Sequence, residues 1–393
     1  MTTAAPTSFS ISQMEQKLPR QRDPLQRLFL LDSMASYYAF TNVARAQELL
    51  AEQQCILDQH DNPDFRLNYH LNKATVDNQL YQFEAAEREF KAAIELLEER
   101  GAAKQLAEAY VDYAGTCMNL EHMDEVLEYL EKATRLLKNF PDERLMARVN
   151  CREGYMHLHY SNYSNAIEFF LEAEKRMTAP QQQLRLKDQY FFTLIHSGLG
   201  KVYERNDEYE KSIRSYLKVV DICRSVGMRT RLSWHYLNVG NGYLALSDYE
   251  NAENYFRKAI DVADDQSQQA RAGAYANVGL CYLEKKEYYQ ALELFDLAER
   301  LYRAKSDTDF YNFSNIESWR GRLYDELNNT ERAMQHYERA LAYAREIEDY
   351  KQLASISKDI AALYAELEDF RNAYEYQLMH SRMEEQYLEQ LER

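Results

Sequence analysis

A pattern of small and aromatic residues returns about every 40 residues along this chain, and this period restricts the fold more than any other feature of the sequence. The copy that contains Gly240 shows the pattern clearly. If Gly240 is counted as position 8 of a unit, aromatic residues occupy positions 11, 17 and 24, and alanines occupy positions 20 and 27. These residues are Tyr243, Tyr249 and Phe256, and then Ala252 and Ala259.

Position 8 can be followed through the whole chain. It is glycine or alanine in every unit except the first, which is degenerate and carries a methionine. Because nine such units fill nearly all of the 393 residues, we expect one extended array of repeats. The residues at position 8 are Met34, Ala74, Ala114, Gly154, Gly200, Gly240, Gly279, Gly321 and Ala361.

Few residues in the chain break helices. There are 11 glycines and 6 prolines, and every proline lies at or before Pro180, which favours helices joined by short turns. Gly240 and Gly242 nevertheless lie inside a predicted helix, where each costs about 1 kcal/mol relative to alanine. We interpret Gly240 as a packing glycine, at a point where a second helix comes too close to leave room for a Cβ. Gly242 has no such explanation.

The spacing of these residues resembles the tetratricopeptide repeat (TPR) family, whose unit is two antiparallel helices. The resemblance implies an all-α fold, a right-handed α-solenoid of about nine helical hairpins with the first helices lining a concave groove. The family's usual unit has 34 residues, so the longer unit here predicts lengthened helices. Longer units of this kind are similar to those of bacterial peptide-pheromone sensors of the Rap type.

The ends of the array differ from its middle. Residues 1–23 are polar and aperiodic and predict a flexible arm, and residues 24–376 form the predicted solenoid. In the final segment, residues 377–393, apolar side chains recur at four-residue steps. This segment is interpreted as a capping helix over the last repeat or, alternatively, as a signalling helix that begins a coiled coil. The recurring residues are Met379, Met383, Tyr387 and Leu391.

Charge and composition restrict the partners. A formal net charge of −17 disfavours nucleic acid and anionic membranes as ligands. No apolar run reaches 18 residues, and the five cysteines are scattered singly, which is typical of reduced thiols. These features predict a cytoplasmic protein without a membrane segment. A homodimer through the terminal helices stays open.

The sequence contains no recognisable catalytic motif. It has no phosphate-binding loop, no paired-cysteine zinc spacing and no HExxH, so we expect neither an enzyme nor a cofactor. Cys151, His157 and His159 are the one group worth testing as metal ligands. Because residues two apart diverge by about 200° on a helix, the two histidines cannot hold one ion, and we predict no metal site.

The resemblance implies that positions 2, 5, 6, 9 and 12 of each first helix face the groove. Asparagine amides at these positions can both donate to and accept from a peptide backbone, arginines can bind a carboxylate, and tryptophans can anchor a ligand. An alternative is that the amides bridge neighbouring helices and that Arg148 and Arg152 pair with nearby carboxylates. The predicted binding residues are Asn72, Arg148, Arg152, Lys201, Trp234, Asn238, Asn241, Asn277, Trp319 and Arg322.

Two functions follow as hypotheses. The first is a non-enzymatic interaction scaffold that binds a peptide or protein segment in its concave groove. The second is a regulatory or sensory module that responds to a peptide or controls an effector such as a kinase, a cyclase or a transcription factor. A peptide-pheromone receptor is a special case of the second.

Overall fold

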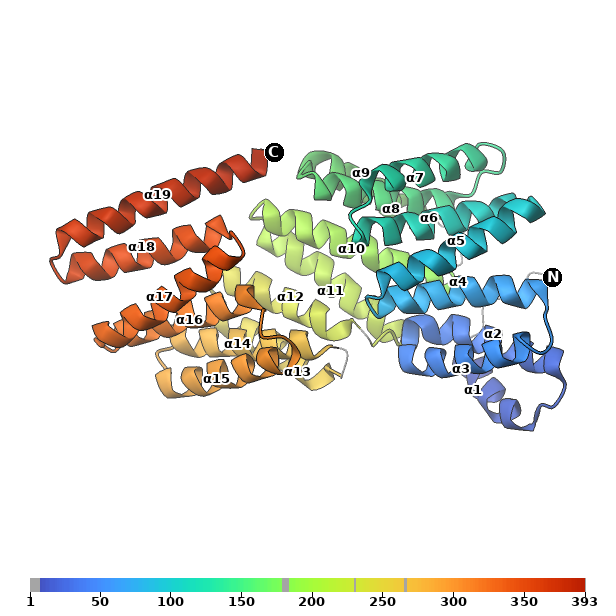
Figure 1. The fold of residues 1–393 in the computed structure, drawn as a ribbon, viewed down its shortest axis with the longest axis horizontal. Helices are drawn as coiled ribbons and strands as arrows, with labels where there is room; N and C mark the ends of the chain where they lie inside the picture. The colour runs from blue at the N-terminus through green and yellow to red at the C-terminus, as the bar shows by residue number, and fades with distance from the viewer. Residues whose placement is uncertain (1–7, 179–183, 230, 265–266, 393) are drawn as a thin grey trace. The chain divides into compact units, whose positions relative to one another are not determined.

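The computed structural model describes residues 8–178, 184–229, 231–264 and 267–392. Within these residues the chain is helical, with one 3-10 turn and no strand (Figure 1). The helices are α1 (Ser8–Lys17), the 3-10 turn η1 (Leu18–Arg20), α2 (Pro24–Thr41), α3 (Val43–Leu57), α4 (Pro63–Gln79), α5 (Phe83–Arg100), α6 (Ala103–Asn119), α7 (Met123–Leu137), α8 (Glu143–His159), α9 (Tyr163–Met177), α10 (Leu186–Arg205), α11 (Tyr209–Val226), α12 (Leu232–Ala245), α13 (Tyr249–Val262), α14 (Gln268–Glu284), α15 (Tyr288–Lys305), α16 (Phe310–Glu326), α17 (Thr330–Glu346), α18 (Tyr350–Glu366) and α19 (Phe370–Glu392).

The repeat frame predicted the hairpins correctly. From α2 to α19 the described helices form nine consecutive pairs, and position 8 falls on the first helix of every pair, from Met34 on α2 to Ala361 on α18. The first helix of most pairs begins before position 1 of the repeat frame. On α14 and α16, for example, the helix begins at Gln268 and Phe310, eleven residues before position 8 in each case. The extra length of the unit therefore extends the N-terminal ends of these first helices.

The glycines at position 8 pack against a ring rather than against a helix backbone. A Cβ built on Gly240 would overlap the ring of Phe256, the position-24 aromatic of the same hairpin. A Cβ on Gly279 would lie 2.8 Å from Phe295, so its neighbour would have to move. The expected close approach at position 8 is confirmed. Its cause differs from the expected helix backbone, because the position-24 ring inserts between the two helices. The same pairing holds for Gly154 with Phe170, Gly200 with Tyr216 and Gly321 with Tyr337.

Most hairpins turn through a residue in the left-handed backbone conformation. Ser247 has a φ of 57°, and the next residue, Asp248, donates its N–H to the carbonyl of Tyr243 at 2.9 Å. This 6→1 bond ends a helix in a Schellman motif, which glycine usually provides. Here none of the residues that provide it, all at position 15, is glycine. They are Tyr81, Glu121, Ser161, Asp207, Ser247, Lys286, Asn328 and Glu368.

The N-terminal segment is helical rather than an unstructured arm. Ile11 on α1 and Leu18 are 3% and 5% exposed, and Glu15 forms a 2.8 Å ion pair with Arg45 on α3. The expectation of an arm over residues 1–23 is therefore wrong for residues 8–20, because two apolar side chains among polar ones were enough to anchor the segment. Residues 1–7 of the predicted arm lie outside the described residues.

The last helix is continuous across the predicted boundary at residue 377. α19 runs from Phe370 to Glu392 and packs along α18. Met379 and Met383 pack against the apolar core of the last two hairpins, as a capping helix would. Its outer face leaves Phe370 and Tyr374 each 69% exposed. The side chain of Leu391 and the whole of Arg393 lie outside the described residues.

Contacts divide the chain into two compact units, residues 1–232 and 233–393, called here the N-terminal and C-terminal units. The N-terminal unit contains α1 to α11, and the C-terminal unit contains nearly all of α12 and the helices after it. A continuous apolar core runs through the middle of the N-terminal unit, from Leu67 to Val202. The C-terminal unit has one core around Phe295 and another around Tyr337.

Candidate functional site

Five of the ten predicted binding residues line one cavity in the C-terminal unit. Its volume is about 490 Å³, within the range of ligand pockets, and its walls come from α12, α14 and α16. These are the first helices of three successive hairpins, so residues at equivalent repeat positions meet across it. The five residues are Trp234, Asn238, Asn241, Asn277 and Trp319.

The three amides form a half-buried cluster. Asn238 and Asn241 lie one turn apart on α12, and Asn277 on α14 donates its Nδ2 to Oδ1 of Asn241 at 2.8 Å. This bond leaves the carbonyl of Asn277 and the NH₂ group of Asn241 available. Among the described residues, the side chain of Asn238 has no hydrogen-bond partner. The cluster therefore offers both donors and acceptors to a ligand.

Apolar and aromatic residues form part of the wall of this cavity. Trp319 packs on Phe295, with ring centroids 5.8 Å apart. A Cβ built on Gly273 would lie 3.1 Å from the hydroxyl oxygen of Tyr302, so the glycine leaves room between α14 and the end of α15. Burial raises the pKa of Tyr302 above its ordinary value, and the hydroxyl stays protonated as a donor.

Several polar residues of this wall were missed in the sequence, among them the carboxylate Asp309. Gln269 and Asn312 line the cavity, and Asn312 donates to Asp309 at 2.9 Å. Both lie on the early part of α14 and α16, ahead of position 1, where the standard repeat has no residues. The only signal that could have predicted them was the six-residue excess in repeat length.

Two other predicted residues, Arg152 and Lys201, line a cavity of about 380 Å³ in the N-terminal unit. Arg152 on α8 donates its Nε to the carbonyl oxygen of Val111 at 3.3 Å, and its guanidinium lies 4.9 Å from the ring centroid of Phe191. Lys201 on α10 keeps solvent access within the cavity. Its pKa is lowered, first by burial and then by the charge of Arg231.

Arg148 is held by the protein itself. It is 3% exposed, its Nε donates to Oδ1 of the fully buried Asp188 at 3.1 Å, and Glu108 lies 3.8 Å from its NH1. Burial favours the neutral form of Arg148, but the nearby Glu108, Asp188 and Asp112 carboxylates outweigh burial and raise the pKa of Arg148. The prediction that Arg148 faces a ligand is therefore wrong, and the alternative of a local pair is correct.

Asn72 and Arg322 also have partners within the protein. Asn72 donates to Oδ1 of Asp32 at 3.1 Å, which bridges the first two hairpins. Burial raises the pKa of Asp32 to about 6, although the amides around it lower that pKa. Arg322 donates to Oε1 of Glu284 at 2.7 Å, between α16 and α14. Neither residue lines the cavities described above, so the structure does not place them at the ligand sites expected from their repeat positions.

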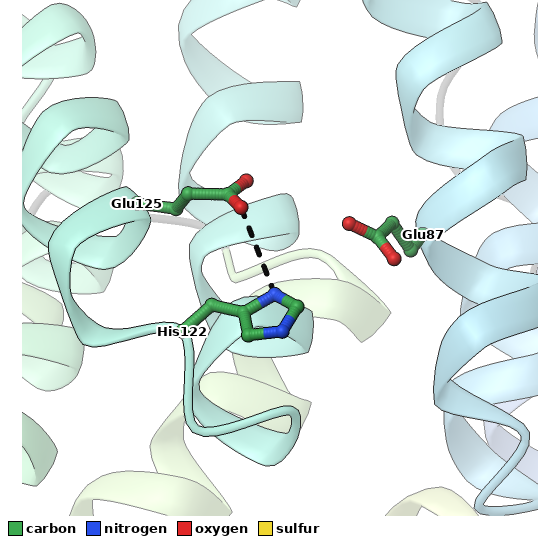
Figure 2. A group of neighbouring side chains, drawn as sticks. All are labelled: Glu87, His122 and Glu125. Carbon is green, nitrogen blue, oxygen red and sulfur yellow. Dashed lines mark ion pairs between the residues drawn. The ribbon is translucent and has the colours of Figure 1, made fainter.

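One group of described residues has the spacing of a metal site. Ligand atoms of Glu87, His122 and Glu125 lie within 4.8 Å of one another (Figure 2). Glu87 is paired with Lys91 at 2.8 Å, and the one hydroxyl hydrogen of Tyr113 is donated either to Glu125, at 2.9 Å, or to Glu87, at 3.1 Å. The Lys91 hydrogen bond lowers the pKa of Glu87. Because both carboxylates already have partners, we assign no metal to this group.

The three residues considered as metal ligands in the sequence, Cys151, His157 and His159, do not converge on one point. Cys151 is fully buried, and burial raises the pKa of its thiol to about 12. The ring of His157 stacks on Phe169 with centroids 5.1 Å apart, whereas His159 lines the N-terminal cavity.

In the described part of the chain, no helix is both long and apolar enough to cross a bilayer.

The fold and the sequence can now be compared with known proteins. Tetratricopeptide repeat family models match residues 192–265 and 318–347, on hairpins that the structure contains. Both matched segments are tetratricopeptide repeats. A family model for the 26S proteasome subunit RPN7 matches residues 68–193, in the N-terminal unit.

Solved structures share this fold along most of the chain. The apo form of RapI has a TM-score of 0.59 at 14% identity, covering 96% of this chain and 99% of that one. A Rap protein complexed with competence and sporulation factor has a TM-score of 0.54 at 16% identity, covering 97% and 99%. The apo quorum sensor NprR from B. thuringiensis has a TM-score of 0.54 at 12% identity, covering 85% and 92%. At these identities the likeness concerns the fold alone.

A curated protein matches part of the sequence. The transcriptional activator NprA of Geobacillus stearothermophilus is 26% identical over 203 residues, which is 46% of this chain. The match covers 49% of that protein, so the chain spans about half the length of this curated relative.

Proposed function

We propose that this protein is a peptide-responsive regulatory TPR module that binds an extended peptide in the cavity of the C-terminal unit. The observation that carries the proposal is the amide cluster of Asn238, Asn241 and Asn277 in a cavity that Trp234 and Trp319 also line. Amides aligned in this way match the alternating donors and acceptors of a peptide backbone, and the two indole rings match apolar side chains. The module acts by binding and not by catalysis.

The similar proteins support a regulatory role. One matched structure is a quorum sensor, another is a Rap protein complexed with competence and sporulation factor, and the curated relative is a transcriptional activator. A ligand regulates such a protein by binding one conformation better than another. The effector that this module controls is left open in the proposal.

The alternative is a scaffold that holds a segment of a larger protein in the same cavity. The two functions differ in the ligand, since the scaffold needs a stoichiometric protein partner and the sensor binds a free short peptide. Both use the same asparagines, so the site can be tested before the choice between them is made.

The test uses the chain's two tryptophans, both of which line this cavity. Heptapeptides selected from a displayed random library should shift the tryptophan emission on titration. The double variant Asn238→Ala, Asn277→Ala should weaken binding at least about 30-fold, because two amides each lose backbone hydrogen bonds. Selected peptides that bind the double variant as tightly as the unaltered protein would refute the site.

The matched control removes two asparagines from an exposed surface of the same unit. Asn251 and Asn254 on α13 are both exposed, and the variant Asn251→Ala, Asn254→Ala should bind as the unaltered protein does. Recovery of a protein from lysate that competes with the heptapeptides, and that needs Asn238 and Asn277, would favour the scaffold.

A further inference from the structure

The inner face of the N-terminal unit closes on itself. Phe40 on α2, in the first hairpin, contacts Tyr190 on α10, in the fifth, with ring centroids 5.1 Å apart. The guanidinium of Arg231, which precedes α12, lies 5.9 Å from the ring of Tyr81, which follows α4. These contacts join elements far apart in sequence, and they surround the cavity of about 380 Å³ introduced above.

Positive charge collects in this cavity. Four cationic side chains line it, and Asp112 is its one carboxylate among the described lining residues. Asp112 is already paired with Lys187. The remaining cations are Arg152, Lys201 and Arg231.

None of these three cations has a carboxylate within ion-pair distance among the described residues. Arg152 contacts the Val111 carbonyl oxygen and the ring of Phe191, and Arg231 lies over Tyr81. Glu204, one turn from Lys201 on α10, forms a hydrogen bond with Tyr216. Although the chain has 64 acidic residues against 47 basic ones, its described part brings these three cations together with no carboxylate in ion-pair contact. Gathering like charges in a partly enclosed site costs free energy unless an anion balances them.

Much of the remaining wall is apolar or aromatic, and Thr75, Asn78, Gln79, Asn119 and His159 add polar groups to it. The ring of Phe191 contacts the guanidinium groups of Arg148 and Arg152, and Tyr190, Tyr155 and Leu194 also line the cavity. The hydroxyl of Tyr155 donates to the Leu194 carbonyl oxygen at 2.8 Å, so its ring is fixed as part of the wall. An inorganic anion would use the cations and leave these surfaces without a partner.

We propose that this cavity binds an organic oxyanion, a carboxylate or phosphate joined to an apolar or aromatic group. Arg152, Lys201 and Arg231 contact the anionic oxygens, and the aromatic wall contains the apolar group. The site lies wholly within the N-terminal unit and does not depend on the peptide site proposed for the C-terminal unit. Its ligand can be a free small acid or the carboxyl end of a peptide, because both present the same chemistry.

The test compares charged and neutral probes of one shape on the full chain. Hippurate should bind in calorimetry and raise the melting temperature, and hippuramide, which lacks the negative charge, should bind at least about tenfold more weakly. The affinity for phenyl phosphate, compared with that for hippurate, shows whether the cavity binds a phosphate or a carboxylate more tightly. Equal effects of hippurate and hippuramide, or phenyl phosphate binding no tighter than inorganic phosphate, would overturn the proposal.

Variants locate the site. Lys201→Met and Arg231→Met should each weaken hippurate binding at least about tenfold, whereas Lys175→Met, whose side chain is 80% exposed on α9, should leave it unchanged. Both cavity variants should keep the unaltered helical circular dichroism, which separates lost binding from lost folding. Undiminished hippurate binding in both folded variants would refute the assignment.

A final experiment distinguishes the two possible sources of the anion. The pentapeptide Gly-Gly-Gly-Phe-Gly with a free carboxyl end is compared with its amidated form. Binding of the free form alone identifies the cavity as a site for a peptide end, and binding of hippurate without the pentapeptide identifies a free small acid. If hippurate, phenyl phosphate and the free pentapeptide all fail to bind, the proposal is refuted.

Discussion

The cavities of the two units use the same repeat positions for different chemistry. At position 6 the N-terminal cavity has Arg152 and the C-terminal cavity has Asn238, and at position 9 they have Lys201 and Asn241. The glycine at position 8 packs under a position-24 ring in both units. The framework is thus set by one group of positions and the ligand chemistry by another, so a shared fold does not predict a shared ligand.

The largest effect should come from substituting Arg148. This arginine is a structural cation, whereas the cations beside it line the cavity. Arg148→Met leaves the buried Asp188 carboxylate without its main partner and should lower the free energy of unfolding by about 3–5 kcal/mol. Urea unfolding measures this loss. Adding Asp188→Asn should recover part of it. A loss below about 1 kcal/mol would show that the pair is not needed for folding.

The framework should respond equally in both units. Gly200→Val and Gly279→Val each place a side chain against a ring, since a Cβ would lie 2.8 Å from Tyr216 or from Phe295. Each should cost about 2–3 kcal/mol in urea unfolding. Gly101→Ala meets no atom within 4 Å and serves as a control for crowding, although its φ of 62° adds a small backbone cost. A clearly unequal loss of unfolding free energy in the two variants would contradict a shared framework.

One pH effect should come from Asp32, which joins the first two hairpins of the N-terminal unit. The pKa of Asp32 is about 6 in the folded protein and 3.8 in the unfolded chain, so the folded state binds the extra proton between these values. Stability from this group is therefore greatest below pH 3.8 and falls as the pH rises toward 6. Asp32→Asn should be more stable than the unaltered protein by about 1–2 kcal/mol at pH 7.

The measurement for Asp32 is the difference in unfolding free energy between the two proteins at several pH values. That difference should grow from pH 4 to pH 6 and then stay constant. Asp61→Asn, an exposed residue near the same hairpins, is the control and should show no such growth. A difference that does not depend on pH would mean that Asp32 is ionised throughout.

The smallest effects compare the two cavities directly. Lys201→Met removes a charge from a cationic cavity, so in the absence of an anion it should raise stability by about 0.5–1 kcal/mol. Asn238→Ala removes an amide without a described partner and should change stability by less than about 0.5 kcal/mol. Thermal unfolding in low-salt buffer measures both. A loss of stability in Lys201→Met would show that the lysine supports the fold.

The repeat pattern alone predicted the hairpins and their packing positions, and it predicted that the first helices carry the ligand-facing residues. The pattern could not predict which of those residues remain available to a ligand. Asn238 and Asn277 face a cavity, whereas Arg148 is paired with Asp188, forty residues further along the chain. The pattern also missed Arg231, which lies outside the repeat positions and reaches the N-terminal cavity because the unit closes on itself.

The sequence by itself determined the helical hairpins, because small and aromatic residues at fixed spacings can bury their surfaces only by pairing and stacking. The tertiary structure alone decided which charges and amides have partners. That outcome depends on side chains that meet across several repeats, and no local spacing encodes those distances. Periodicity therefore predicts the framework of this protein, and the contacts between side chains of different repeats determine the chemistry of its cavities.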